Sequence, residues 1–167
     1  MGDIFVEQII RRRISLGGIV LRALSIFALL VGILLIPRLL MLGFTIAILL
    51  GYVVYLTFVY TNVEYEYSLV NGELSIDKIL GKRKRKAGEE YDLKKAELIA
   101  PIDYPEVEAK SNNVVKANYA GNMGEFGKYA LILNGVDGIK GQLMVIIEPN
   151  DSLKDAMYKV RPNVFKQ

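Results

Sequence analysis

Two long apolar segments near the beginning of the chain restrict its possible folds more than any other feature. They run from Ile19 to Ile36 and from Leu39 to Tyr60, with only Pro37–Arg38 between them. One continuous helix over these 42 residues would be about 63 Å long, twice the roughly 30 Å of a bilayer's hydrocarbon core. Because proline lacks the N–H that a helix interior needs, the sequence predicts two helices with a tight break at Pro37–Arg38.

The composition of both segments favours insertion into a bilayer. Each contains 13 leucine, isoleucine, valine and phenylalanine residues, which together contribute about −4 to −8 kcal/mol per span. Arg22 opposes the first span by at most about 3 kcal/mol, and its side chain is near enough to the start to reach the headgroups. A cleaved signal peptide is disfavoured because a second apolar segment follows. Two buried helices of a soluble protein are disfavoured because neither segment has a charged face.

Small residues recur at four-residue spacing in both predicted helices. That spacing places each set on one helix face and allows two backbones to approach closely. We therefore expect the two helices to pack through these faces, although glycine and alanine are common in spans and the pattern also arises by chance. The residues are Ala28 and Gly32 in the first helix, and Gly43, Ala47 and Gly51 in the second.

The arginines predict the orientation of the hairpin. Arg11, Arg12 and Arg13 precede the first segment and Lys78 follows the second, whereas only Arg38 lies at the expected tip. Positively charged residues flanking a span remain on the cytoplasmic side of the membrane. The sequence therefore predicts a cytoplasmic basic N-terminus over residues 1–18, a two-span hairpin over 19–60 in the cell (inner or plasma) membrane, and a cytoplasmic C-terminal domain over 61–167.

The distribution of charge argues against a nucleic-acid-binding domain. The residue types that the chain lacks exclude several kinds of metal and catalytic site. The net charge of +3 comes from the first 60 residues, since the remainder holds equal numbers of acidic and basic residues; this does not indicate a nucleic-acid-binding domain. The chain has no cysteine or histidine, which excludes disulfides, Cys or His metal sites and His-based nucleophilic triads. No cofactor motif and no catalytic residue emerges, and we expect a non-enzymatic protein.

The spacing of the acidic residues does not predict a metal site or a catalytic site. Glu89, Glu90 and Asp92 lack the spacing of a calcium loop, and a solvated surface is the simpler interpretation. Asp103 with Glu106 and Glu108 resembles a carboxylate pair only in composition, because nothing in the sequence places these residues in a pocket.

In the remainder of the chain, apolar and polar residues alternate as they do in β-strands. Val63–Val70 and Glu73–Leu80 flank Asn71–Gly72, the strongest signal for a type I′ hairpin. A charged third strand is expected after Gly81. Further strands are expected at Glu97–Ile102, Asn113–Tyr119, Tyr129–Asn134 and Gly141–Glu148.

A helix is predicted at the end of the domain. Leu153, Ala156, Met157 and Val160 lie on one face of a helix over about 152–161, with Ser152 as its N-cap and Pro162 after its end. The predicted fold is a transmembrane α-helical hairpin followed by a mostly β (α+β) domain. That domain would be a bent antiparallel sheet or open barrel closed by the C-terminal helix.

This order of elements resembles the bacterial pleckstrin-homology-like fold, and in particular small bacterial membrane proteins with a membrane hairpin ahead of such a domain. The resemblance is carried by Asn62–Tyr67 (NVEYEY), Val70–Ile79 (VNGELSIDKI), Gly81–Arg85 (GKRKR) and Glu148–Asn150 (EPN). It implies the fold and the membrane topology. It transfers no catalytic or binding residue, and the segment from Pro105 to Gly127 departs from a compact seven-strand pattern.

Two segments are candidates for contact with other molecules. A basic run, together with the arginines at 11–13, suits anionic headgroups, each charge near the surface contributing about 1 kcal/mol; a solvated loop or an edge strand protected by lysines is the alternative. The glycine-rich loop 121–127 lacks the dinucleotide-binding spacing, and it is either a flexible connection or a partner-binding loop through Met123 and Phe126. The basic run consists of Lys82, Arg83, Lys84, Arg85 and Lys86.

Three functions are compatible with these features. The first is a membrane-anchored interaction or scaffold module that binds a protein partner or a second copy of itself at the cytoplasmic face. The second is a sensor of anionic lipid. The third is an accessory subunit of a membrane enzyme or transporter, although the spans offer almost no ionisable residue for an ion pathway. The expected partners are the lipid bilayer and a protein, without nucleic acid or metal.

Overall fold

The computed structural model describes residues 4–112, 114–136, 138–139 and 141–166. The chain divides into two compact units. We call Arg13–Val63 with Ile79–Arg85 the hairpin unit, and the remainder, Met1–Arg12, Glu64–Lys78 and Lys86–Gln167, the β unit.

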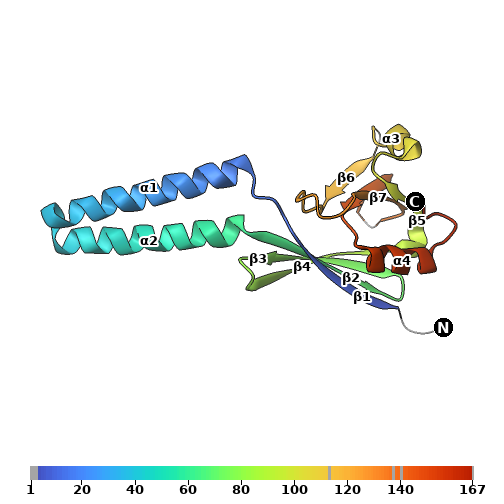
Figure 1. The fold of residues 1–167 in the computed structure, drawn as a ribbon, viewed down its shortest axis with the longest axis horizontal. Helices are drawn as coiled ribbons and strands as arrows, with labels where there is room; N and C mark the ends of the chain where they lie inside the picture. Colours follow the sequence, from blue (N-terminus) through green and yellow to red (C-terminus); the bar gives the residue numbers. More distant parts are fainter. Residues whose placement is uncertain (1–3, 113, 137, 140, 167) are drawn as a thin grey trace. The chain divides into compact units, whose positions relative to one another are not determined.

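Two long antiparallel helices form most of the hairpin unit (Figure 1). Helix α1 spans Leu16–Leu39 and begins at the N-cap Ser15, whose Oγ accepts a hydrogen bond from the Gly18 N–H at 3.1 Å. Helix α2 spans Met41–Thr61. Both are long and apolar enough to cross a membrane, and only 6% and 11% of their most apolar windows are buried. They are therefore not core helices covered by their own chain.

The reversal lies at Leu40, so the predicted break at Pro37–Arg38 is wrong by two residues. Pro37 stays inside the last turn of α1, and the chain turns only where Leu40 adopts a φ of +46°. A proline this near the helix end removes one hydrogen bond without ending the helix. The turn is tight because Gly43 lies against α1: a Cβ at Gly43 would be 2.6 Å from the Ile36 Cα.

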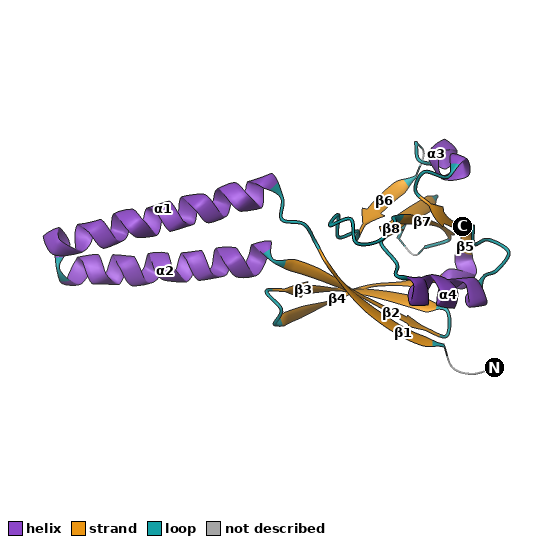
Figure 2. Cartoon of the chain, in the orientation of Figure 1, coloured by secondary structure: helices purple, strands orange, loops and turns teal. Residues whose placement is uncertain are grey.

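A four-stranded sheet, in the order β1-β2-β3-β4, contains the predicted hairpin (Figure 2). Strands β2 (Val63–Val70) and β3 (Glu73–Leu80) have the predicted bounds, and Asn71 and Gly72 both have positive φ, as a type I′ turn requires. The charged strand expected after Gly81 is β4 (Lys84–Asp92).

Strand β1 (Phe5–Arg11) was not predicted, because residues 1–18 were interpreted only as a basic segment. It pairs antiparallel with β2, from Phe5 opposite Val70 to Arg11 opposite Glu64. Gln8 and Ile10 are buried on one face while Phe5 and Ile9 are exposed on the other. A buried glutamine among exposed apolar residues hides the alternation that identifies a strand in sequence.

The second sheet has the order β5-β7-β8-β6 and is not wholly antiparallel. Its strands are β5 (Ala96–Pro101), β6 (Val115–Asn118), β7 (Tyr129–Asn134) and β8 (Gln142–Ile147). Strand β6 pairs parallel to β8, which corrects the expected antiparallel sheet. The connection from β6 to β7 through the glycine-rich segment places β6 on the far side of β8, and sequence gives no signal for that pairing direction. The described residues of the domain form two open sheets and no closed barrel.

Three short helical segments complete the β unit: η1 (Leu93–Lys95), α3 (Pro105–Lys110) and α4 (Asp151–Val160). The N-cap of α4 is Asn150 rather than the predicted Ser152, since the Asn150 Oδ1 accepts a hydrogen bond from the Leu153 N–H at 2.8 Å. Asparagine and serine cap equally well, and the chain uses the first of them. Leu153, Ala156 and Met157 form the buried face of α4, as predicted, whereas Val160 is half-buried.

The hairpin turn generates a prediction with a matched control on the same helix. Gly43→Ala forces a Cβ onto the Ile36 backbone and should destabilise the hairpin by about 1–3 kcal/mol, the usual cost of overpacking. Gly51→Ala meets nothing within 4 Å and should be neutral or stabilising, because alanine is the better helix former. Thermal unfolding of the full chain in detergent, followed by circular dichroism, measures both. Equal melting temperatures for the two variants would contradict the close turn.

Candidate membrane-contact site

The hairpin unit contains seven basic residues and no aspartate or glutamate. Six of the seven lie at or near one end, where α1 begins and α2 ends, and only Arg38 lies near the tip. We call this end the base of the hairpin. An apolar body with positive charge at one end has the charge distribution of a membrane hairpin oriented by its basic residues. The six are Arg13, Arg22, Lys82, Arg83, Lys84 and Arg85.

The β3–β4 turn belongs to the base because it is fixed to the last turn of α2. The Gly81 N–H donates to the Asn62 carbonyl at 2.8 Å, and a Cβ at Gly81 would lie 2.9 Å from the Val59 Cγ1. Only glycine permits this approach. This contact brings the basic residues 82–85 to the end of α2, although they follow it by twenty or more positions in sequence. Sequence spacing alone does not predict that proximity.

Lys82 adopts an unfavourable backbone conformation in this turn. Gly81 and Lys82 have φ of +56° and +60°, and the Arg83 N–H donates to the Leu80 carbonyl at 3.2 Å. Glycine adopts this region freely, but for lysine it costs about 1–2 kcal/mol. The structure therefore retains a cation at a position where glycine would be more stable.

Arg22 is oriented by contacts from α2. Its Nε donates to the Thr61 Oγ1 at 2.7 Å, and its guanidinium carbon lies 4.5 Å from the centre of the Phe58 ring. Thr61 is the last residue of α2, so the Arg22 side chain extends towards the base, as expected for an arginine near the start of a span.

Two of the basic residues predicted to contact lipid, Arg11 and Arg12, have polar partners in the β unit. Arg11 pairs with Glu64 at 3.1 Å, and the Arg12 Nη1 donates to the Tyr65 hydroxyl at 2.9 Å. These two therefore have partners within their own sheet, which weakens the case for them as headgroup contacts.

The contact between the helices follows a seven-residue repeat of small residues. The buried residues of α1 are Gly18, Ser25 and Gly32, and those of α2 are Gly43 and Thr57. This is the repeat of a left-handed helix pair. The Ser25 and Thr57 hydroxyls donate to carbonyls of their own helices at 2.9 and 2.8 Å, so the interface leaves neither hydroxyl without an acceptor.

Of the residues predicted to pack, some lie in this interface and one lies outside it. A Cβ at Gly32 would be 2.7 Å from the Leu50 Cδ1 and 3.9 Å from the Ala47 Cα. Ala28 and Ala47 are half-buried. Gly51 faces open space, because the four-residue spacing used for the prediction drifts off the interface. The seven-residue spacing, which identifies Gly18, Ser25 and Thr57, was the signal missed.

The loop from Gly121 to Gly127 is fixed at its start and exposed at its centre. The Asn122 N–H donates to the Glu148 Oε1 at 2.9 Å, and a Cβ at Gly121 would be 2.3 Å from the Arg11 carbonyl oxygen. Glu148 is fully buried, and its Oε2 has no hydrogen-bond partner among the described residues. Met123 and Phe126 are 51% and 37% exposed, so the loop presents two apolar side chains from a fixed attachment.

A tyrosine cluster inside the β unit has a structural role. The Tyr91 hydroxyl contacts the Glu89 Oε2 at 2.7 Å and the Tyr119 hydroxyl at 3.0 Å, and the Tyr67 hydroxyl donates to the Tyr119 carbonyl at 2.8 Å. Burial raises the pKa of Tyr67, Tyr91 and Tyr119. These phenols therefore stay protonated at physiological pH and act as hydrogen-bond donors, not as bases.

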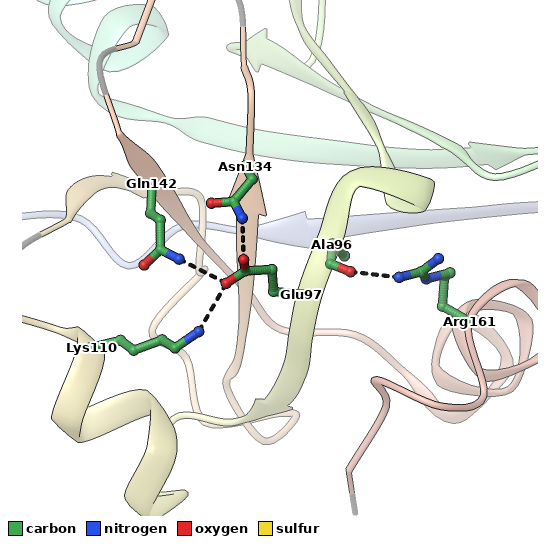
Figure 3. A network of polar contacts seen from close by, with 6 residues as sticks. All are labelled: Ala96, Glu97, Lys110, Asn134, Gln142 and Arg161. Carbon is green, nitrogen blue, oxygen red and sulfur yellow. Dashed lines mark hydrogen bonds and ion pairs between the residues drawn. The ribbon is translucent and has the colours of Figure 1, made fainter.

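Glu97 is the centre of a second polar network, shown in Figure 3. It accepts hydrogen bonds from the Lys110 Nζ at 2.9 Å, from the Gln142 Nε2 at 2.7 Å and from the Asn134 amide. The hydrogen bond from Lys110, reinforced by the two amides and the lysine charge, lowers the pKa of Glu97. With its neighbours from α3, β7 and β8 already bound, this carboxylate joins elements of the second sheet and is not free for catalysis.

Two further grooves lie in the β unit, and acidic residues line part of each. One, of about 340 Å³, is lined by residues including Glu73, Glu89 and Glu90. The other, of about 370 Å³, is lined by residues including Asp103 and Glu108. No group of three His, Cys, Asp or Glu residues in the described part of the chain is placed to hold a metal ion.

Comparison with protein families decides the identity of the fold. The family model described as "Bacterial PH-like domain (DUF6106)" matches residues 2–167, almost the whole chain. The chain belongs to this bacterial PH-like family. The resemblance inferred from the sequence is thereby confirmed, and the match extends over the apolar helices as well as the strands. PH-like domains are generally non-enzymatic. Comparisons with curated proteins and with solved structures gave no match.

Proposed function

We propose that this PH-like protein is a membrane-anchored, non-enzymatic interaction module. Helices α1 and α2 span the inner membrane as a hairpin, and the β unit is displayed at the cytoplasmic face, where it binds a protein partner or a second copy of the chain. The observation that carries the proposal is the charge distribution of the hairpin unit, with six basic residues at or near the base, one near the tip and no acidic residue.

The apolar surface of the hairpin supports a bilayer as its surroundings. Large side chains are exposed along both helices, among them Leu34 at 76%, Met41 at 85% and Ile48 at 72%. Exposing two whole helices of such residues to water is unfavourable by about 25 cal/mol for each Å² of apolar surface. Hydrocarbon removes that cost, and the backbone hydrogen bonds within each helix satisfy the requirement of a lipid interior.

The connection between helix and sheet supports display at the surface. Strand β2 begins at Val63, two residues after the last residue of α2, Thr61. Such a short connection keeps the first residues of the domain close to the end of the span. The exposed side chains of the loop 121–127, Met123 and Phe126, are the candidate protein contacts, because exposed apolar groups on an otherwise polar loop suit a partner surface.

A role in sensing anionic lipid is the second candidate, and the geometry of the β3–β4 turn favours it. The turn is held at the base by the Gly81–Asn62 hydrogen bond. It carries Lys82 and Arg83, and Lys84 and Arg85 follow as the first two residues of β4. Each such charge near an anionic surface contributes about 1 kcal/mol, within a Debye length. In an anchored module, the turn only contacts the headgroups. In a sensor, that contact would also change the conformation of the β unit.

Topology mapping tests the anchored arrangement. The chain has no cysteine, so single cysteines at Met41→Cys, beside the tip, and Asp151→Cys, in the β unit, report without background. In intact bacterial cells a membrane-impermeant thiol reagent should label only residue 41, because the base lies inside. Residue 151 should react only after permeabilisation. Labelling of residue 151 in intact cells would refute the orientation, and labelling of neither site in any condition would refute the exposed tip.

Hydrogen–deuterium exchange tests the lipid contact of the turn. In nanodiscs of full-length protein, amides near residues 82–86 should exchange more slowly with phosphatidylglycerol than with phosphatidylcholine alone, and salt should remove the difference. Lys82→Gln/Lys84→Gln should reduce the difference markedly, because it removes about 2 kcal/mol of surface attraction and leaves only the two arginines. Lys94→Gln/Lys159→Gln, which removes two exposed lysines of the β unit, is the matched control.

The set of amides that phosphatidylglycerol protects from exchange distinguishes the anchored module from the lipid sensor. Protection confined to the turn indicates an anchored module that rests on the headgroups. Protection that reaches the loop 121–127 indicates a sensor. Identical exchange in both lipids would eliminate the headgroup contact and leave the anchor alone.

A further inference from the structure

The charge of Arg22 has no partner of opposite sign within the hairpin unit. Between Ile19 and Tyr60 the only charged residues are Arg22 and Arg38, and the whole unit lacks carboxylates. Among the described residues, the guanidinium of Arg22 donates one hydrogen bond, from Nε to Thr61. A guanidinium carries five N–H donors, so the four on the two Nη atoms remain available.

Arg22 lines a groove at the base of the hairpin. It has a volume of about 320 Å³ and is formed wholly within the hairpin unit. Apart from Arg22 and the polar Asn62, its walls are apolar, aromatic or glycine. Tyr55 and Phe58 are 50% and 42% exposed, so aromatic surface is open to whatever fills the groove. The lining residues are Ile14, Arg22, Tyr55, Phe58, Val59, Asn62 and Gly81.

The guanidinium is held at the level of the base. Its two fixed contacts, the Thr61 hydroxyl and the Phe58 ring, come from the last turn of α2. The β3–β4 turn meets the groove at Gly81, directly before Lys82 and Arg83. In a bilayer, the end of a span coincides with the lipid phosphates. The available donors of Arg22 are therefore placed where phosphate oxygens lie.

We propose that this groove binds one anionic phospholipid, whose phosphodiester is held by the two Nη groups of Arg22. The planar fork of a guanidinium matches two oxygens of one phosphate. The aromatic wall of Tyr55 and Phe58 accommodates the beginning of the acyl chains, which distinguishes a lipid from free phosphate. The neighbouring Lys82 and Arg83 favour a headgroup of net negative charge over a zwitterionic one. The site rests on the proposed function, because the groove meets lipid only if the hairpin spans a bilayer.

Native mass spectrometry of the full-length protein in detergent tests the site. Phosphatidylglycerol is titrated against wild type, Arg22→Gln and Arg38→Gln, the last being the matched control at the other end of the same helix. Wild type and Arg38→Gln should bind one lipid with similar affinity, and Arg22→Gln should bind it at least tenfold more weakly. Phosphatidylcholine should bind more weakly than phosphatidylglycerol, and diacylglycerol, which has no phosphate, should bind all three proteins equally poorly.

A second variant tests the positioning of the guanidinium. Thr61→Val keeps the side-chain shape but removes the acceptor of the Arg22 Nε, and should weaken phosphatidylglycerol binding by about twofold to fivefold. Melting temperatures in detergent establish that the variants remain folded. Removing a charge from an apolar helix does not oppose its insertion, so Arg22→Gln should keep the hairpin intact.

Three results would overturn the site: unchanged phosphatidylglycerol affinity in Arg22→Gln, equal losses in Arg22→Gln and Arg38→Gln, or displacement of the lipid by millimolar inorganic phosphate. The last would show a phosphate site without lipid recognition. The experiments distinguish failure of the lipid site from failure of the proposed membrane anchor. If residue 41 is labelled from outside while Arg22→Gln binds lipid like wild type, only the lipid site is lost.

Discussion

The proposed function depends first on what surrounds the apolar hairpin. The two helices have apolar side chains on all sides, and no more than about a tenth of their most apolar windows is buried by the chain itself. In the proposed arrangement, hydrocarbon supplies the apolar contact that the chain does not. The absence of any carboxylate from the hairpin unit gives this unit a net positive charge, most of it at or near the base. In the proposed arrangement, the base lies at the anionic surface of the membrane.

The two helices pack closely because the residues at their interface are small, not because large side chains interlock. Gly18, Ser25 and Gly32 face Gly43 and Thr57 along the interface, and the hydroxyls bond to their own helices. In the proposed bilayer there is no hydrophobic force between helices, and close backbone approach would supply the attraction. The same device operates at Gly81, where a missing side chain brings the basic turn against Val59. Small residues thus determine both the hairpin and the position of its charges.

The sequence predicted what depends on local pattern and failed where distant segments meet. Two apolar segments, the Asn71–Gly72 turn and the face of α4 follow from periodicity and turn chemistry alone. Strand β1 was missed because its partner lies more than fifty residues away and its buried face carries Gln8. The parallel pairing of β6 with β8 has no local signal. The basic run was noticed, but its place at the base depends on a hydrogen bond from Gly81 to Asn62 that no spacing rule provides.

The central claim, that hydrocarbon surrounds the hairpin, is tested most directly by the depth of spin labels along α2. Single cysteines at Leu42, Leu49 and Tyr60, all exposed, are labelled in the full-length protein and reconstituted into liposomes. Collision rates with oxygen, relative to a water-soluble nickel chelate, should be highest at residue 49 and lower at residues 42 and 60, near the two ends of the span. High exposure to the chelate at all three positions, or low exposure to both reagents at all three, would show water or protein around the helices and contradict the account.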